Sequence, residues 1–208
     1  MKLACQRKFV CIGLLLVCAV LTACGDRTPA LPRLAPDDVV LAFGDSLTYG
    51  TGASEAESYP VVLSSLIGRP VVSAGVPGEL TAGGLARLAG VLDTVQPRIM
   101  LLCLGGNDML RKVNAAQIEA NLRELIDIAI ARGVAVVLIG VPKPALFGGT
   151  ASFYERIADD YAIAFDGNTV NEILKNNEYK SDPIHPNALG YRKLATALSE
   201  LLRLGGAI

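Results

Sequence analysis

Four short apolar runs, each followed by glycine or polar residues, constrain the fold of this chain more than any other feature. They span residues 39–43, 71–72, 99–104 and 134–139. Continuous apolarity, without the alternation of a half-exposed strand, is typical of strands buried on both faces, as in a parallel sheet. We therefore expect the four runs to form strands of one sheet.

The segments between these runs carry apolar residues at helical spacing. The residues expected at the helix starts are Ser58, Thr81, Asn114, Ser152 and Asn187. Gln117 follows Asn114, and Glu155 follows Ser152, by the three residues of a capping box. Gly133 can close the helix that Asn114 begins. The expected apolar faces are Val62, Leu63, Leu66 and Ile67; Leu85, Leu88, Ala89 and Leu92; Ile118, Leu122, Leu125, Ile126 and Ala129; and Tyr191, Leu194, Leu198 and Leu201.

The alternation of strands and helices predicts an α/β sheet with helices on both faces. Ligands of such sheets bind at the carboxyl ends of the strands. The length of 208 residues favours one domain. With 19 basic and 20 acidic residues the chain is not a basic nucleic-acid binder, and its single histidine excludes a His-rich metal site.

The first residues have the pattern of a secretory signal. Residues 1–8 are basic, residues 9–20 are apolar and uncharged, and small residues follow. The apolar run is too short to span a bilayer comfortably, although an uncleaved anchor helix is the alternative. The sequence LTAC resembles the lipobox of bacterial lipoproteins, which implies cleavage after residue 23 and lipidation of Cys24. Ordinary cleavage without a lipid remains open.

These features divide the chain into a signal peptide (residues 1–23), a proline-rich tether (24–38) and a domain (39–208). The resemblance places the protein in the bacterial cell envelope, lipid-anchored and facing the periplasm. Gly25, rather than Asp, after Cys24 slightly favours the outer membrane. Without the signal peptide and a lipidated Cys24, Cys103 is the only other cysteine, and its apolar surroundings indicate a buried residue.

Three polar clusters stand at expected strand ends or in loops. Residues 44–48 (GDSLT) follow the first run, residues 104–108 (LGGND) follow the third, and residues 182–187 (DPIHPN) precede the last helix. Each cluster alone has an ordinary structural explanation as a helix cap or turn. Together they supply a hydroxyl, an amide, an imidazole and a carboxylate. A serine nucleophile requires a base, and that base requires a group to orient it.

In these clusters the chain resembles the SGNH (GDSL) serine hydrolases, in particular the bacterial arylesterase and thioesterase/lysophospholipase subgroup. Residues 75–79 (GVPGE) match the second family block, and all four blocks occur in family order. The resemblance implies a three-layer α/β/α sandwich, flavodoxin-like, with a mainly parallel five-stranded sheet, its fifth strand near residues 162–165. It implies a triad of Ser46, Asp182 and His185. The implied oxyanion hole consists of Ser46, Gly78 and Asn107.

The implied activity is cleavage of carboxylic esters or thioesters through an acyl-serine, without metal or cofactor. The partners are then a small-molecule substrate and, through Cys24, a membrane; no nucleic acid is expected. Ser73 and residues 79–80 depart from the pattern of many relatives, which leaves substrate preference open. A carbohydrate O-acetylesterase and a catalytically silent binding lipoprotein are the alternatives. In the loop 142–149, Leu146 and Phe147 either line an acyl pocket or pack on the core.

Overall fold

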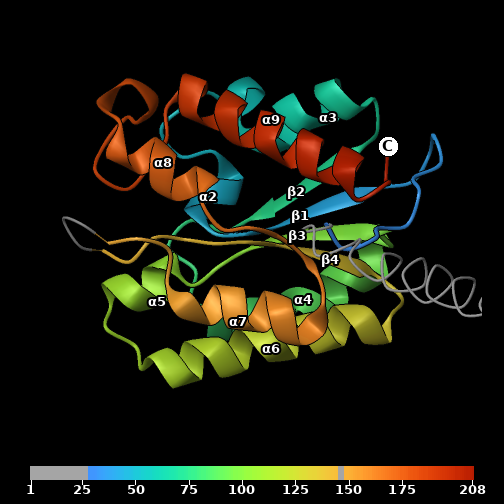
Figure 1. Ribbon diagram of the computed structural model, residues 1–208, viewed down its shortest axis with the longest axis horizontal. Helices are drawn as coiled ribbons and strands as arrows, with labels where there is room; N and C mark the ends of the chain where they lie inside the picture. The colour runs from blue at the N-terminus through green and yellow to red at the C-terminus, as the bar shows by residue number, and fades with distance from the viewer. Residues whose placement is uncertain (1–27, 145–147) are drawn as a thin grey trace, which may run out of the picture.

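A five-stranded parallel sheet forms the centre of the computed structural model, which describes residues 28–144 and 148–208 (Figure 1). The strands lie in the order β2-β1-β3-β4-β5, the doubly wound order expected of a flavodoxin-like fold. All four neighbouring pairs are parallel. Their bounds are Val40–Gly44 (β1), Val71–Gly75 (β2), Ile99–Cys103 (β3), Ala135–Ile139 (β4) and Ala164–Asp166 (β5). The fold expected from the sequence is confirmed, including its fifth strand.

Helices cover both faces of the sheet and make a three-layer sandwich. In Figure 1, α3 and α9 lie on one side of the sheet, and α4, α6 and α7 lie on the other. Their bounds are Tyr59–Ile67 (α3), Thr81–Val95 (α4), Ala115–Ala131 (α6), Ser152–Tyr161 (α7) and Ala188–Leu204 (α9). Shorter helices are Ser46–Tyr49 (α2), Gly106–Leu110 (α5) and Thr169–Lys175 (α8), with 3-10 turns at Glu55–Glu57 and Asn177–Tyr179.

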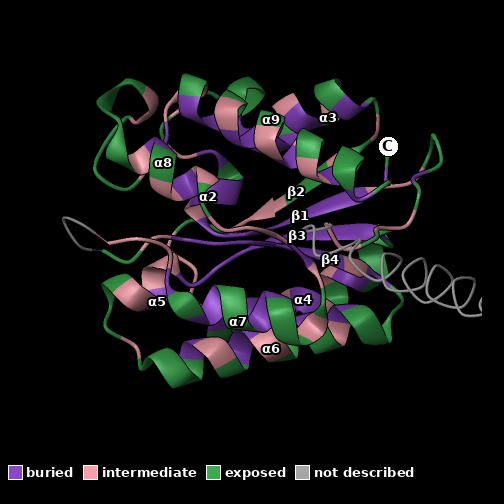
Figure 2. Cartoon of the chain, viewed as in Figure 1, coloured by how far each residue is buried: buried purple, intermediate pink, exposed green. Residues whose placement is uncertain are grey.

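The central strands are fully buried, as their continuous apolarity predicted. Every residue of β1 and β3 is buried (Figure 2). Strand β2 differs, because it lies at an edge of the sheet and is only partly covered, with Val72 exposed. Cys103, at the end of β3, is buried and free of any disulfide, and burial raises the pKa of its thiol well above the ordinary value.

The helix starts agree with the sequence in part. Asn114 and Asn187 cap α6 and α9, accepting hydrogen bonds from Ala116 N–H and Gly190 N–H. Neither expected capping box is present. The side chain of Gln117 instead donates to Asn121, and residue 152 lies inside α7. Gly133 closes α6 as expected, with a positive φ of 73°.

Two further features differ from expectation. Leu66 was expected on the buried face of α3, but its side chain is 49% exposed, because the buried face follows the i, i+4, i+8 row of Tyr59, Leu63 and Ile67.

The described end of the tether is also attached to the domain. Its Leu34 is buried, and the N–H groups of Leu31 and Leu34 donate to carbonyls of residues 205 and 207.

The expected signal peptide and Cys24 lie outside the described residues. Within residues 28–144 and 148–208, the structure contains no helix with the length and apolarity needed to cross a bilayer.

Candidate active site

Ser46 lies where the chain turns from β1 into α2, at the carboxyl edge of the sheet. Gly44 makes this turn possible, because a Cβ there would collide with the Cys103 carbonyl and the Thr48 side chain. Asp45 then caps α2 by accepting a hydrogen bond from Leu47 N–H at 3.0 Å. The short helix therefore starts with the Ser46 hydroxyl at the edge of a cavity.

His185 lies in a loop that is closed by backbone hydrogen bonds within the loop itself. Ser181 N–H donates to the His185 carbonyl at 2.9 Å, and Lys180 bridges to Pro186. One carboxylate oxygen of Asp182 accepts the N–H groups of Ile184 and His185, at 2.8 and 2.9 Å. Residue 182 thus shapes the loop as well as contacting the imidazole ring.

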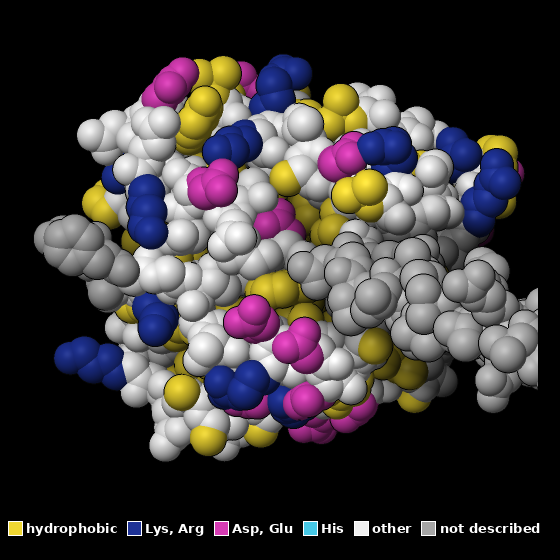
Figure 3. Space-filling model, viewed as in Figure 1, with side chains coloured by type: hydrophobic (Ala, Val, Ile, Leu, Met, Phe, Trp, Pro, Cys, Tyr) yellow, Lys and Arg dark blue, Asp and Glu magenta, His cyan; other side chains and the backbone are white. Residues whose placement is uncertain are grey.

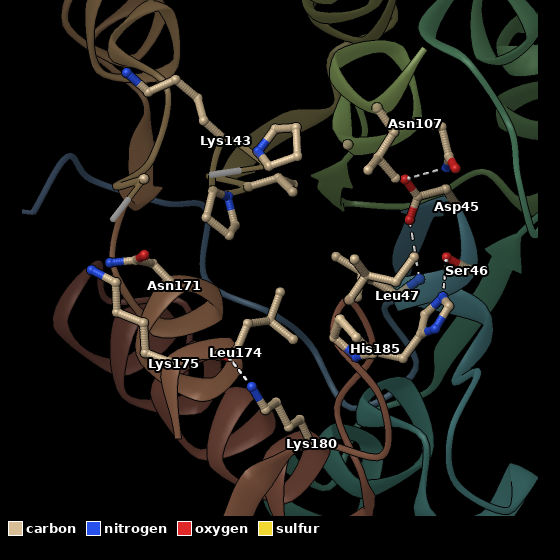
Figure 4. A pocket seen from close by; sticks show the side chains of 18 residues that line it. Asp45, Ser46, Leu47, Asn107, Lys143, Asn171, Leu174, Lys175, Lys180 and His185 are labelled. Carbon is tan, nitrogen blue, oxygen red and sulfur yellow. Dashed lines mark hydrogen bonds between the residues drawn. The ribbon is translucent and has the colours of Figure 1, made fainter. Parts of the chain in front are cut away.

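The structure brings Ser46, His185 and Asp182 into one hydrogen-bonded chain. His185 Nε2 lies 3.1 Å from Ser46 Oγ (Figure 4), and His185 Nδ1 lies 2.8 Å from Asp182 Oδ2. Although partial burial pushes the pKa of Asp182 upward, hydrogen bonds from His185 and Ile184 outweigh it and hold that pKa below its ordinary value. The carboxylate is therefore ionised and able to orient the imidazole.

Asn107 reaches the same cavity from α5, directly after β3. Its side-chain nitrogen donates to Asp45 Oδ2 at 3.1 Å, which occupies one of its two hydrogens and fixes the plane of the amide. Burial raises the pKa of Asp45 to about 7, against the hydrogen bonds from Leu47 and Asn107, which lower it. No local sequence pattern indicates that Asp45 would contact Asn107.

Gly78 follows β2, the neighbour of β1, but it is not among the residues that line the cavity. It lies in a turn closed by Glu79 N–H donating to the Val76 carbonyl, and its φ of +77° favours glycine. The guanidinium of Arg111 donates to the Gly78 carbonyl at 3.3 Å. Gly78 therefore lies on the same edge of the sheet as the other predicted site residues, because β1 and β2 end together, but it does not line the cavity.

A partly buried arginine, which was not among the residues expected at the site, connects the loops after β1 and β2. Arg87 forms two hydrogen bonds to the Glu79 carboxylate, at 2.6 and 2.7 Å. It also donates to the carbonyls of Gly44 and Ala74, at 3.3 and 2.9 Å, and lies over the Phe43 ring. Glu79, at which this chain departs from the pattern of many relatives, therefore has a specific partner for its carboxylate.

A buried polar network joins the loops after β2 and β3. The carboxylate of Asp108, next to Asn107, accepts hydrogen bonds from the backbone and hydroxyl of Thr81, at 2.9 and 2.7 Å. Asn121 of α6 donates to the same hydroxyl at 2.8 Å. Thr81 therefore does not cap α4 but anchors its first turn to α5.

The cavity beside Ser46 and His185 has a volume of about 550 Å³. Much of its wall is apolar, formed by Leu47, Leu110, Val141, Leu174 and Ile184, among others. Helix α8, which was not expected from the sequence, contributes Asn171, Leu174 and Lys175. Leu146 and Phe147, two candidates for lining it, lie outside the described residues.

Charged side chains outside the cavity are mixed in sign. On the face shown in Figure 3, basic and acidic groups are interspersed over α6 and α7, where Arg123 and Arg156 share Glu119. No group of three or more potential metal ligands occurs within residues 28–144 and 148–208.

Comparison with known proteins identifies the family. Residues 42–193 match the GDSL-like lipase/acylhydrolase family. The chain belongs to this family. The match therefore runs from within β1 to the second turn of α9, and it includes Ser46, Asn107, Asp182 and His185.

Individual relatives agree with this assignment. The chain is 32% identical over 163 residues to Escherichia coli thioesterase 1/protease 1/lysophospholipase L1, covering 74% of this chain and 78% of the relative. It is 28% identical to an arylesterase of Vibrio mimicus, covering 71% and 79%. The crystal structure of TesA superposes with a TM-score of 0.73 at 26% identity, covering 81% of this chain and 99% of TesA. This GDSL-like protein is thus an ester-cleaving serine hydrolase.

Proposed function

We propose that Ser46 is the nucleophile of this hydrolase, His185 its general base and Asp182 the group that orients the imidazole. The hydrogen bond of 3.1 Å between His185 Nε2 and Ser46 Oγ carries the proposal. His185 takes the hydroxyl proton as Oγ bonds to the acyl carbon. It then gives that proton to the departing oxygen or sulfur. Water, activated by the same imidazole, cleaves the acyl-serine and releases the acid.

The negative charge that develops on the acyl oxygen requires donors at fixed positions. We assign these to the backbone N–H groups of Ser46 and Gly78 and to the side-chain amide of Asn107. The bond from Asn107 to Asp45 supports the assignment, because it uses one amide hydrogen and aims the other. The assignment of the Gly78 N–H rests on the family resemblance and on the position of Gly78 in the loop after β2.

We propose carboxylic esters or thioesters with a sizeable apolar part as the substrates. The names of the relatives, which include a thioesterase/lysophospholipase and an arylesterase, support this range. A cavity of about 550 Å³ with an apolar wall also offers more room than an acetyl group fills. That size supports a longer acyl or alcohol part over the alternative, an envelope carbohydrate O-acetylesterase.

Localisation forms a separate part of the proposal. The basic and apolar residues before LTAC support export, and the LTAC sequence supports lipidation of Cys24. Two or more acyl chains would anchor the protein stably to a membrane of the cell envelope, facing the periplasm. Metabolic labelling with a palmitate analogue tests this. Label that is incorporated by the wild type and lost in Cys24→Ala supports the anchor, and an unlabelled wild-type protein contradicts it.

A chain-length series of 4-nitrophenyl esters, measured with the wild type and Ser46→Ala, tests the enzymatic proposal. We expect kcat/KM to rise from acetyl to octanoyl and to fall by several powers of ten in Ser46→Ala. Activity confined to acetyl would favour the carbohydrate deacetylase. A folded wild type without activity on any ester or thioester would favour the silent binding protein.

A further inference from the structure

The cavity beside Ser46 has chemically different ends. One end holds Ser46 and His185, and the other is bordered by Lys143 and Lys175, with Lys180 on the side between them (Figure 4). Three lysines thus line one cavity, although the chain as a whole carries a formal net charge of −1, and the Lys143 side chain extends outward from the cavity wall (Figure 4). This concentration of positive charge has no role in the proposed hydrolysis.

No carboxylate neutralises these lysines in the part of the chain that the structure describes. Some other cations there form ion pairs, for example Arg123 with Asp160 and Lys193 with Glu172, whereas Lys143, Lys175 and Lys180 form none within the described residues. The acceptors that they do contact are uncharged.

Two of these neutral contacts position the ammonium groups. Lys180 donates to the Leu174 carbonyl at 3.1 Å. Lys175 donates at 3.3 Å to the amide of Asn171, when that amide is oriented to donate to the Gly148 carbonyl. Each bond uses one of the three ammonium hydrogens and none of the charge. The charge and remaining donors are therefore available to a ligand.

The only acidic side chain that lines this cavity within the described residues is Asp45. Its carboxylate is buried and accepts hydrogen bonds from Leu47 and Asn107, so it does not compensate the lysines. Between the two ends the wall is apolar, with Val141, Leu174 and Ile184. A ligand that matches all three parts has a carbonyl at Ser46, an apolar middle and a negative charge at the far end.

We propose that the end of the cavity bordered by Lys143, Lys175 and Lys180 is a subsite for an anionic group, carboxylate or phosphate, carried by the ester substrate. The proposal rests on the proposed function in taking Ser46 as the point of attack. Lysine ammonium groups bind such anions as mobile point charges, which suits a subsite on two loops and a short helix. The anion belongs either to the acyl part or to the alcohol part of the ester.

Two matched substrate pairs distinguish these sources. Mono-4-nitrophenyl suberate against 4-nitrophenyl octanoate places a carboxylate on an eight-carbon acyl chain. Octanoyl lysophosphatidic acid against 1-octanoylglycerol places a phosphate on the alcohol. In at least one pair we expect kcat/KM of the anionic member to exceed that of the neutral member by about tenfold, since each exposed ammonium–anion pair contributes roughly 1.5- to 5-fold. Raising NaCl from about 0.05 to 0.5 M should reduce this ratio.

Variants connect the preference to the lysines. Replacing all three by glutamine should bring the ratio close to one, and replacing all three by arginine should largely preserve it. Arg132→Gln, which removes one positive charge before β4 at the opposite edge of the sheet, should leave the ratio unchanged. A ratio near one for both pairs in the wild type, or a preference that survives the glutamine variant, would overturn the subsite.

These results are separate from the test of the proposed function. If the neutral esters are hydrolysed but the anionic members gain nothing, the subsite is wrong and the hydrolase mechanism stands. If no member of either pair is hydrolysed, the proposed function fails and the subsite fails with it.

Discussion

The Nε2 atom of His185 lies 3.1 Å from Oγ of Ser46, although 139 residues separate the two in the sequence. The β1–α2 turn fixes one partner, and the loop before α9 fixes the other. Both elements lie at the carboxyl edge of the sheet, where doubly wound folds bind their ligands.

Asp182→Asn should lower kcat by about two to four powers of ten while the protein stays folded. Asparagine can still accept the N–H groups of Ile184 and His185, so the loop is retained. It cannot stabilise the imidazolium, and it favours the wrong tautomer. Ester kinetics and thermal unfolding of the same preparation check this. Kinetics like those of the wild type would show that Asp182 only shapes the loop.

Asn107→Ala should lower kcat by roughly 10²–10³, because one oxyanion donor is removed, and should change KM little. The control is the thermal midpoint, since the same change leaves Asp45 Oδ2 without its donor. If a large fall in the midpoint accompanies an unchanged kcat at permissive temperature, Asn107 is a structural residue and not an oxyanion donor.

Asp45 should make the free energy of unfolding decrease with rising pH. Its pKa is about 7 in the folded protein and 3.8 as an unperturbed group, so the folded state binds the extra proton between these values. This stabilisation is complete below pH 4 and is lost as the pH rises to 7. The free energy of unfolding of Asp45→Asn, measured by urea unfolding relative to that of the wild type, should therefore rise by about 3 kcal/mol from pH 5 to pH 8. A pH-independent difference between the two proteins would contradict the burial of an ionisable group.

Much of the fold follows from local sequence patterns, and most of the candidate triad does too. The apolar runs gave the strands because burial on both faces requires continuous apolarity, and Asn114 and Asn187 cap helices as expected. Leu66 was misplaced because the row of α3 that packs on α9 depends on tertiary contacts.

Other parts of the site leave no such local signal. Arg87 and Glu79 stand eight residues apart, and Asp45 and Asn107 stand 62 apart. The first pair forms because α4 runs back beside the loop after β2, and the second forms because the neighbouring strands β1 and β3 end together. Helix α8 has only seven residues, four of them polar or charged, and its three apolar residues at helical spacing (Val170, Ile173 and Leu174) are too few to predict a helix from the sequence.

Arg87→Met should destabilise the protein by about 1–3 kcal/mol, because Glu79, whose side chain is only 8% exposed, loses its partner. The double variant with Glu79→Gln should recover part of the loss, since no buried charge then remains unpaired. Arg132→Met, at an exposed pair with Asp93, should cost less than about 0.5 kcal/mol. Urea unfolding compares the three. Equal effects at positions 87 and 132 would show that the buried pair contributes nothing special.

The most direct test of the central claim, that His185 activates Ser46 for attack, is labelling with a fluorophosphonate followed by peptide mass mapping. We expect one adduct per chain, on Ser46, formed rapidly by the wild type and at least about 10²-fold more slowly by a folded His185→Ala variant. A wild type that forms no adduct at Ser46, or a His185→Ala variant labelled at the wild-type rate, would contradict the mechanism.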